Sequence, residues 1–540
     1  MKRDLPTWRD VAVVFVVALL VRAVALPLAT ISSGDDVMRV WLSWLWSEHP
    51  FLITEGVWAP LHFYLTGAVL AVWPEPMVAP AVLHVVIGSI APVGVYLLAR
   101  ELFGSNRAAL LAGLAFAVYP IAISNSLAPK SETPFVMFMA FGLYFLARAR
   151  RTDARLRSAV AAGICIGLGT MLRYEAWMLL PFMALLLVHR PQRALVFVAV
   201  AMIHPVFWMA GNWMAHGDPL YSFTWTSWWE REAMGKAAVV SVGWRIDQAI
   251  GFWRLILRQM TPVVVILSAA GIYLCLRHRR PQAVWLLVPL GLAALMQFAI
   301  LRGSLTVKPS YMVNFGLLLM PFTAAAWQTL GVDRWSRRTF LAAGFVLVAA
   351  IGVCTVKPLL QAIPGGGRLL VSVAPRFGNE EAAQRVLTIM ASDQSRGTEA
   401  LVSDFLGWTS GAYVAFNTKL HPSNICIAQG APGLPEGVSA TREFLVGHPT
   451  GTLIRLDGGR LSRHFAPVGH DRVQFAGLTL DLIRLGETPW TGPAPGAGAA
   501  QAGELPRVHV DRYVVVAGVD RAEEAPESHQ YAYYCPVAWQ

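Results

Sequence analysis

The sequence predicts a polytopic α-helical membrane protein with about eleven transmembrane helices, followed by a C-terminal α/β domain outside the membrane. Of the 540 residues, 55% are hydrophobic and 14% are charged. The mean hydropathy is +0.50, a composition that a water-soluble globular protein does not carry. Apolar runs recur as far as residue 356, and hydropathy falls after that. We therefore expect a transmembrane domain at 1–356 and a soluble domain at 357–540.

The apolar runs set the expected spans. A bilayer core of ~30 Å needs about 20 apolar residues of helix. Runs near this length predict spans at 11–30, 80–99, 108–127, 133–148, 158–174, 175–189, 194–213, 261–277, 282–301, 311–331 and 339–356. The first run is too long for a signal peptide and no small-residue cleavage site follows it, so we expect it to be retained. Segment 61–73 is predicted to lie at the outer interface without crossing.

Arginines in alternate short loops predict the orientation. Cytoplasmic loops carry an excess of Lys and Arg, which places the N-terminus inside and the C-terminal domain outside. These loops hold Arg100, Arg107, Arg148, Arg150, Arg151, Arg155, Arg157, Arg190, Arg193, Arg277, Arg279, Arg280, Arg334, Arg337 and Arg338. The net charge of +11 is thus explained by topology, and no basic helix with interleaved aromatics indicates nucleic-acid binding. We expect a prokaryotic inner or plasma membrane.

The C-terminal region has the pattern of a small α/β domain. Apolar β-type runs at 368–373, 400–403, 424–428 and 452–456 alternate with helical patterns at 379–392 and 437–447. Two strands are expected within 474–485 and another from 507, after a Gly-, Ala- and Pro-rich linker. No phosphate loop or metal-ligand spacing occurs here, so we expect a binding or structural role. Whether Cys426 and Cys535 form a disulfide is left open.

An acidic pair, Asp35 and Asp36, marks the first outward loop. Two adjacent carboxylates cost several kcal/mol to bury unpaired, so a chain this apolar is expected to use them. The outward loops also hold the cations Arg39, Lys130, Arg173, Arg302 and Lys308. Transfer from a lipid-linked phosphate needs such a set, because a carboxylate takes the acceptor proton while cations stabilise the departing phosphate.

Each of these residues also has a structural interpretation. Gly34-Asp35-Asp36 is a good N-cap for an interfacial helix. Lys130 and Glu132 can be a solvated loop pair, and Arg173 can reach the lipid headgroups or pair with Glu175. Arg302 and Lys308 fit topology or lipid contacts better than catalysis.

Several short motifs follow one another along the chain. They are Asp35-Asp36, Trp58-Ala59-Pro60-Leu61-His62-Phe63-Tyr64, Ala99-Arg100-Glu101-Leu102-Phe103-Gly104, Tyr119-Pro120 and Gly217-Asp218-Pro219-Leu220-Tyr221. In this order they resemble the GT-C glycosyltransferases, above all the branch of protein O-mannosyltransferases and lipid A aminoarabinose transferases, which is glycosyltransferase family 39-like. The resemblance covers roughly 1–230 well and the later spans loosely.

The resemblance implies a reaction and a site. It implies a GT-C-like fold, a polyprenyl-phosphate sugar donor, inversion at the anomeric carbon, and Asp35 or Asp36 as general base. Lys130, Arg173 and Arg39 are the candidates for binding the donor phosphate. Further candidates are Glu132, Glu175, His62, Arg302, Lys308 and Tyr311. The acceptor is a glycan, lipid or protein with a hydroxyl or amine, and the protein also contacts membrane lipids. No Asp-x-Asp pair follows in the second outward loop, so we expect no metal and no other cofactor.

Two other classes of function remain as alternatives. A polytopic lipid or solute transporter would also have many spans, but with internal repeats and broken helices. A membrane-anchored binding or scaffold protein would act through its C-terminal domain. A third alternative is an enzyme that hydrolyses a lipid phosphate instead of transferring a sugar from it.

Overall fold

The computed structural model describes residues 8–28, 30–31, 34–153, 155–228, 242–305, 308–361, 376–377, 380–391, 400–403, 414, 416, 418, 420, 424–427, 438–456, 464–469, 471–489 and 507–518. The chain forms two compact units. The helical unit is Met1–Ala29, Leu52–Leu65 and Pro80–Pro375; the sheet unit is Thr30–Phe51, Thr66–Ala79 and Arg376–Gln540. The predicted domain boundary at 356/357 stays a prediction.

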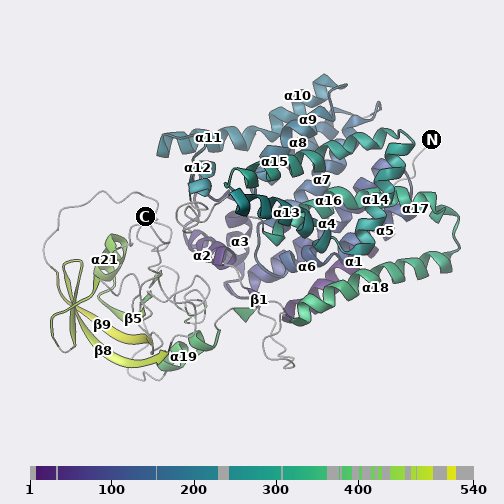
Figure 1. The fold of residues 1–540 in the computed structure, drawn as a ribbon. Coiled ribbons are helices and arrows are strands. Elements are labelled where there is room, and N and C mark those ends of the chain that lie inside the picture. The colour runs from purple at the N-terminus through teal and green to yellow at the C-terminus, as the bar shows by residue number, and fades with distance from the viewer. Residues whose placement is uncertain are drawn as a thin grey trace. The chain divides into compact units, whose positions relative to one another are not determined.

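Apolar helices make up the helical unit (Figure 1). They are α1 (Trp8–Ala25), α4 (Ala79–Phe103), α5 (Asn106–Ala117), α6 (Pro120–Ser126), α7 (Glu132–Arg150), α8 (Leu156–Thr170), α9 (Glu175–Leu185), α10 (Pro191–Ala201), α11 (Ile203–His216), α12 (Tyr221–Trp228), α13 (Val242–Gln259), α14 (Pro262–Arg277), α15 (Leu287–Leu301), α16 (Met312–Leu319), α17 (Thr323–Thr329) and α18 (Arg337–Gln361). Short 3₁₀ turns join several of them, at Leu26–Leu28, Pro281–Leu286, Pro309–Tyr311, Met320–Phe322 and Val332–Arg334. Helix α3 (Leu61–Val72) has residues in both units.

Several expected spans are bent or interrupted. Within the described residues, two helical segments are long and apolar enough to cross a membrane, Ala79–Phe103 and Pro281–Leu301. The number rises to five if three bent pairs each count as one span: α5 with α6 at 54°, α10 with α11 at 40°, and α13 with α14 at 101°. The helical architecture is therefore as predicted, while the count of about eleven spans stays a prediction.

Arg22 of α1 stabilises the break between α5 and α6. A helix that ends inside a protein leaves carbonyl groups that need donors. The Arg22 Nη1 donates to the Ala117 carbonyl at 2.9 Å, and its Nε donates to Ser126 Oγ at 2.9 Å. Gly88 makes room for this side chain, because a Cβ there would lie 2.5 Å from that of Ser126 and 3.1 Å from Arg22 Nε. One buried cation thus hydrogen-bonds to the last residue of each of the two helices.

Arginines of the loops predicted to be cytoplasmic also close helix ends. Arg193 Nη1 donates to the Ala149 carbonyl at 2.8 Å, in the last turn of α7. Arg107 Nη1 donates to the Trp335 carbonyl at 2.5 Å. Because helix C-termini carry partial negative charge, cations are favoured there. These arginines therefore have a packing role in addition to the topological one that their sequence positions indicate.

A seven-stranded sheet forms the core of the sheet unit, in the order β4-β3-β5-β9-β8-β7-β6. Strand β3 is parallel to β4 and to β5, and the remaining neighbours are antiparallel. The strands are β3 (Leu401–Ser403), β4 (Ile425–Ile427), β5 (Thr450–Leu456), β6 (Ala466–Pro467), β7 (Arg472–Phe475), β8 (Leu478–Pro489) and β9 (Arg507–Gly518). Helices α19 (Glu380–Ala391) and α21 (Val438–Gly447) belong to the same unit. The predicted C-terminal α/β domain is confirmed as a sheet domain; the expected strand at 368–373 lies outside the described residues.

Two further elements complete the sheet unit. Strand β1 (Thr30–Ile31) pairs in parallel with β2 (Arg376–Phe377). Helix α2 (Gly34–Glu48) follows β1 and carries the acidic pair in its first turn. By its contacts, this segment of the first outward loop groups with the C-terminal part of the chain.

Candidate active site

Arg173 lies between two carboxylates in the turn from α8 to α9. Its Nη1 lies 3.0 Å from Glu132 Oε1, and its Nη2 lies 2.7 Å from Glu175 Oε1. Nε also donates to Glu175 at 3.0 Å, and Nη1 donates to Ser131 Oγ at 3.1 Å. The side chains of Arg173, Glu132 and Glu175 are 12%, 9% and 13% exposed. We call these three residues the Arg173 cluster.

Local folding explains why two glutamates meet there. Glu132 is the first residue of α7 and Glu175 is the first residue of α9. Negative charge is favoured at a helix N-terminus, where the first N–H groups have no partner within the helix. The chain turns sharply before α9, since the Arg173 N–H donates to the Gly169 carbonyl at 3.0 Å. This turn directs the guanidinium at both helix starts.

The Arg173 cluster carries more negative than positive charge. One guanidinium faces two carboxylates, so its charge is already compensated. The guanidinium of arginine is always protonated in proteins, and here two nearly buried carboxylates lie within 3.0 Å of it. Arg173 therefore stays charged and holds the two glutamates; an incoming phosphate would have to displace one of them.

Tyr311 covers the Arg173 guanidinium. The guanidinium carbon lies 5.1 Å from the centre of the Tyr311 ring, a cation–π contact. The ring thus shields one face of the guanidinium, while Glu132 and Glu175 occupy its edge.

His62 and Asn125 fix the backbone around Lys130. His62 is fully buried, and its Nε2 lies 3.0 Å from the Pro129 carbonyl. Asn125 Nδ2 donates to the Ser310 carbonyl at 3.1 Å, and the Asn125 carbonyl accepts from Thr133 Oγ1 at 2.7 Å. Lys130 thus lies between Pro129, whose carbonyl contacts the buried His62, and Ser131, which accepts a hydrogen bond from Arg173.

The other predicted cations of the helical unit lie differently. Arg302 follows α15, is exposed, and stacks on Phe298 at 5.4 Å. Lys308 is exposed and immediately precedes the 3₁₀ turn that contains Tyr311. Of the predicted cations, Arg173 is the one that Glu132, Glu175 and Tyr311 surround.

The acidic pair lies in the sheet unit. Asp35 and Asp36 both belong to the first turn of α2, within the helix rather than before it. Asp36 is buried, at 5% exposed; for Asp35 the structure describes the backbone alone. Arg39 is half-buried and lies one turn further along.

The sequence reasoning missed two polar residues of the helical-unit site. Ser131 was treated as loop although it accepts a hydrogen bond from Arg173. Asn125 was not considered, yet it is 1% exposed and ties α6 to the turn before α16. The available signal for Asn125 was an amide inside an apolar run, because a buried polar group needs a hydrogen-bond partner.

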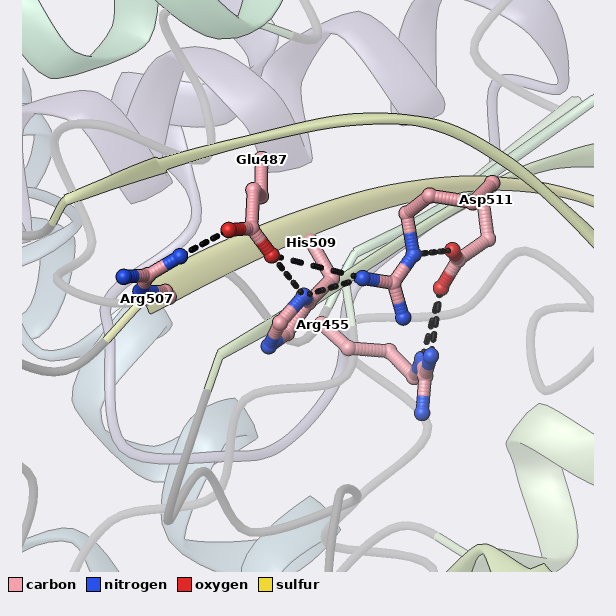
Figure 2. A network of polar contacts seen from close by, with 6 residues as sticks. Arg455, Glu487, Arg507, His509 and Asp511 are labelled. Atoms are coloured by element: carbon pink, nitrogen blue, oxygen red, sulfur yellow. Dashed lines mark hydrogen bonds and ion pairs between the residues drawn. The ribbon is translucent and has the colours of Figure 1, made fainter.

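A second cluster of charges joins three neighbouring strands of the sheet unit (Figure 2). Asp511, 1% exposed, accepts from Arg484 Nε at 2.7 Å and from Arg455 Nε at 2.9 Å. The other members are Glu487, Arg507 and His509. These residues pair across β5, β8 and β9, so the network links the strands and we assign it a structural role.

The described residues include no group of three or more His, Cys, Asp or Glu side chains that could hold a metal ion. The donors of the Arg173 cluster are two carboxylates that already accept from a guanidinium. The expectation that the reaction needs no metal stays a prediction.

Comparison with known proteins shows which family and which structures the chain resembles. The sequence profile of the dolichyl-phosphate-mannose-protein mannosyltransferase family matches residues 49–211. ArnT from Cupriavidus metallidurans, bound to undecaprenyl phosphate, matches with a TM-score of 0.59 and 15% identity over 93% of this chain and 97% of that chain. The apo state of the same protein matches with a TM-score of 0.56 and 15% identity, over 82% and 92%. No curated protein sequence matches the chain.

The chain thus shares its fold with ArnT, and its residues 49–211 match a mannosyltransferase family, so the resemblance predicted from the sequence is confirmed. The two comparisons point to the same branch, that of the protein mannosyltransferases and ArnT, as the proteins that this chain resembles.

Proposed function

We propose that the protein transfers a sugar from a polyprenyl-phosphate donor to an acceptor hydroxyl or amine outside the cytoplasm. The observation that carries the proposal is the fold match with ArnT, which extends over 93% of this chain and 97% of that one. The matching ArnT structure contains bound undecaprenyl phosphate. The match includes the sheet unit, so the similarity is not confined to the helices that any membrane protein would have.

The proposed reaction is a displacement at the anomeric carbon. The acceptor oxygen or nitrogen forms a new bond to the anomeric carbon, and the bond from that carbon to the phosphate oxygen breaks. The polyprenyl phosphate leaves, and the configuration at the anomeric carbon is inverted. A carboxylate that accepts the acceptor proton speeds this step, and cations stabilise the charge on the leaving phosphate. The donor supplies all the energy, and no redox cofactor enters.

Asp36 is our first candidate for the base. Its carboxyl is buried at 5% exposed, in the first turn of α2. A carboxylate withdrawn from water interacts more strongly with a bound acceptor than an exposed one does. Asp35 stays the second candidate, because it lies in the same turn of α2.

Lys130 is our first candidate for the donor phosphate. Its neighbours on both sides are fixed, Pro129 by His62 and Ser131 by Arg173. Arg173 itself is compensated by two carboxylates, so we propose that it shapes the site rather than binding phosphate. Arg39 lies three residues after Asp36, on the same side of α2, and we propose that it helps to bind the donor phosphate.

A disulfide at Cys426 supports the proposed location of the sheet unit. Disulfides persist in oxidising compartments and are rare in the cytosol. Cys426 lies in β4, an edge strand of the sheet, and is 1% exposed. Cys535, the partner considered from the sequence, lies outside the described residues. An oxidised cysteine here fits a domain that folds beyond the cytoplasmic membrane.

A direct assay tests the proposal. Purified full-length protein in lipid nanodiscs is incubated with radiolabelled polyprenyl-phosphate sugars and a membrane extract as the source of acceptor. The proposal predicts labelled acceptor and free polyprenyl phosphate. Release of free sugar without labelled acceptor would indicate hydrolysis instead, and an unchanged donor with every sugar tested would refute the proposal.

Transport is the second candidate, because the structure contains the broken helices that transporters use. Three helix pairs bend by 54°, 40° and 101° at short breaks. At the α5–α6 pair, the buried Arg22 donates to the last residue of each helix, Ala117 and Ser126, which favours a structural bend. Counterflow of labelled lipid or solute in proteoliposomes, without any transfer, would favour this candidate.

A further inference from the structure

We propose that the C-terminal part of the sheet unit positions the acid-bearing helix α2, with Phe416 as the positioning residue. The inference rests on the proposed function, because it concerns the helix that carries the candidate base. It assigns a task to the domain for which the sequence predicted only a binding or structural role. All contacts that carry it lie within the sheet unit.

Backbone pairing provides the first constraint. Thr30 pairs with Arg376 and Ile31 pairs with Phe377 in a parallel two-stranded ladder. Strand β1 ends only a few residues before α2 begins at Gly34. The chain that leaves α1 is therefore tied to the start of the C-terminal region just before it reaches the acidic pair.

An aromatic cluster provides the second constraint. The Phe416 ring lies 6.3 Å from that of Trp41 and 5.8 Å from that of Trp44, between ring centres. The two indoles meet edge-to-face at 5.9 Å. Trp41 is fully buried, and Trp44 and Phe416 are each 7% exposed. Such offset and edge-to-face arrangements are the favoured geometries of aromatic pairs.

The other side of α2 is held by α3. A Cβ at Gly67 would lie 2.4 Å from Trp46 Cε3 and 2.9 Å from the Ser43 carbonyl oxygen. The two backbones thus approach so closely that only glycine fits at this position. Helix α2 is clamped, with α3 against Trp46 and Phe416 against Trp41 and Trp44.

Because Asp36 and the clamped residues belong to one helix, a tilt at the clamped end changes the position of the Asp36 carboxylate. Trp44 lies eight residues after Asp36, which is about 12 Å along the helix axis at 1.5 Å per residue. A tilt of about 10° around the clamped end would move the Asp36 carboxylate by about 2 Å. Misplacement of a catalytic group by about 1 Å can lower the rate about a hundredfold, so Phe416 acts on chemistry without touching substrate.

The variant Phe416→Ala in the full-length chain tests the inference, with Phe465→Ala as the matched control. Phe465 belongs to the same unit and is also 7% exposed, but it stacks on Phe475 at 4.6 Å and not on α2. We expect Phe416→Ala to lower kcat at least about tenfold with donor KM changed less than about threefold. Phe416→Leu, which keeps apolar bulk, should recover part of kcat, and Phe465→Ala should stay within about threefold of wild type.

Hydrogen exchange gives a readout that does not depend on activity. Phe416→Ala should speed amide exchange across 34–44, and Phe465→Ala should not. Unchanged exchange in Phe416→Ala, or equal loss of kcat in both alanine variants, would overturn the inference. If the wild-type chain transfers no sugar, the proposed function fails, while the exchange experiment still decides whether Phe416 holds α2.

Discussion

Arg173 Nη1 lies 3.0 Å from Glu132 Oε1, although 41 residues of sequence separate the two. The contact brings the start of α7 to the turn before α9, where Glu175 occupies the other side of the guanidinium. From the sequence, Arg173 was a candidate for the donor phosphate or for the lipid headgroups. Its surroundings indicate that its charge holds two helix N-termini together.

Removing Arg173 should destabilise the protein. Arg173→Ala leaves two nearly buried carboxylates without their cation, which costs about 3–5 kcal/mol. Thermal unfolding in detergent should show a clearly lower midpoint. Arg302→Ala is the control, because Arg302 is exposed and stacks only on Phe298 among the described residues. An Arg173→Ala midpoint equal to that of the control would contradict a structural role for the cluster.

Lys130 should affect donor binding rather than stability. A hydrogen bond to a charged group contributes about 1.5–3 kcal/mol, so Lys130→Met should raise the donor KM about 10- to 100-fold. Its unfolding midpoint should stay near that of wild type. Lys308→Met, at an exposed position, is the matched control and should change KM less than about threefold. Equal KM values for both variants would remove Lys130 from the donor site.

The close contact of Gly211 with the chain before α3 predicts a third effect. A Cβ at Gly211 would lie 2.0 Å from the Thr54 carbonyl oxygen. The same segment accepts a hydrogen bond from Ser222 Oγ at the Gly56 carbonyl, at 2.6 Å. Gly211→Ala should therefore displace this segment and lower the unfolding midpoint by several degrees.

Gly251 offers the matched control for this prediction. It lies within α13 with nothing within 4 Å of an added Cβ. Alanine is favoured over glycine inside a helix by about 1 kcal/mol, so Gly251→Ala should leave stability unchanged or raise it. If Gly211→Ala behaves like Gly251→Ala, the contact with Thr54 does not restrict that position.

Secondary structure followed from the sequence where the pattern is local. The apolar run at 452–456 predicted β5, which spans Thr450–Leu456, and the helical pattern at 379–392 predicted α19, which spans Glu380–Ala391. Alternation and helical spacing are properties of neighbouring residues, so they are visible in one sequence. The same holds for the apolar helices of the helical unit.

Interruptions of the helices were harder to predict. The run 108–127 was expected as one span, but it bends by 54° between α5 and α6, and α6 starts at Pro120. Proline favours the first turn of a helix and disfavours its interior, so the residue itself was the available signal. Hydropathy alone does not register such a break.

Contacts between distant segments did not follow from the sequence. Periodicity assigns a face to Arg173 but does not say which carboxylates it meets. Similarly, nothing local indicates that α2 packs on Phe416, more than 370 residues later. These pairings depend on the tertiary fold, and they decide the roles of Arg173 and of the C-terminal region.

The redox state of Cys426 tests the side of the membrane. Differential alkylation of the protein in cells should find Cys426 oxidised, since the structure has it in a disulfide and the sheet unit is proposed to fold outside the cytoplasm. Cys275 is a buried free cysteine and serves as the control, which should react only after unfolding. A reduced Cys426 in the mature protein would contradict the proposed location.

The central claim is that a carboxylate at the start of α2 acts as base in sugar transfer, and the variants Asp36→Asn and Asp35→Asn measure it most directly. Each is purified in nanodiscs and assayed for transfer from a radiolabelled polyprenyl-phosphate sugar, with unfolding midpoints as the control for folding. Loss of a general base costs about 10²- to 10⁴-fold in rate. We expect that loss in Asp36→Asn at an unchanged midpoint, with Asp35→Asn less affected. Wild-type transfer rates in both variants would contradict the account.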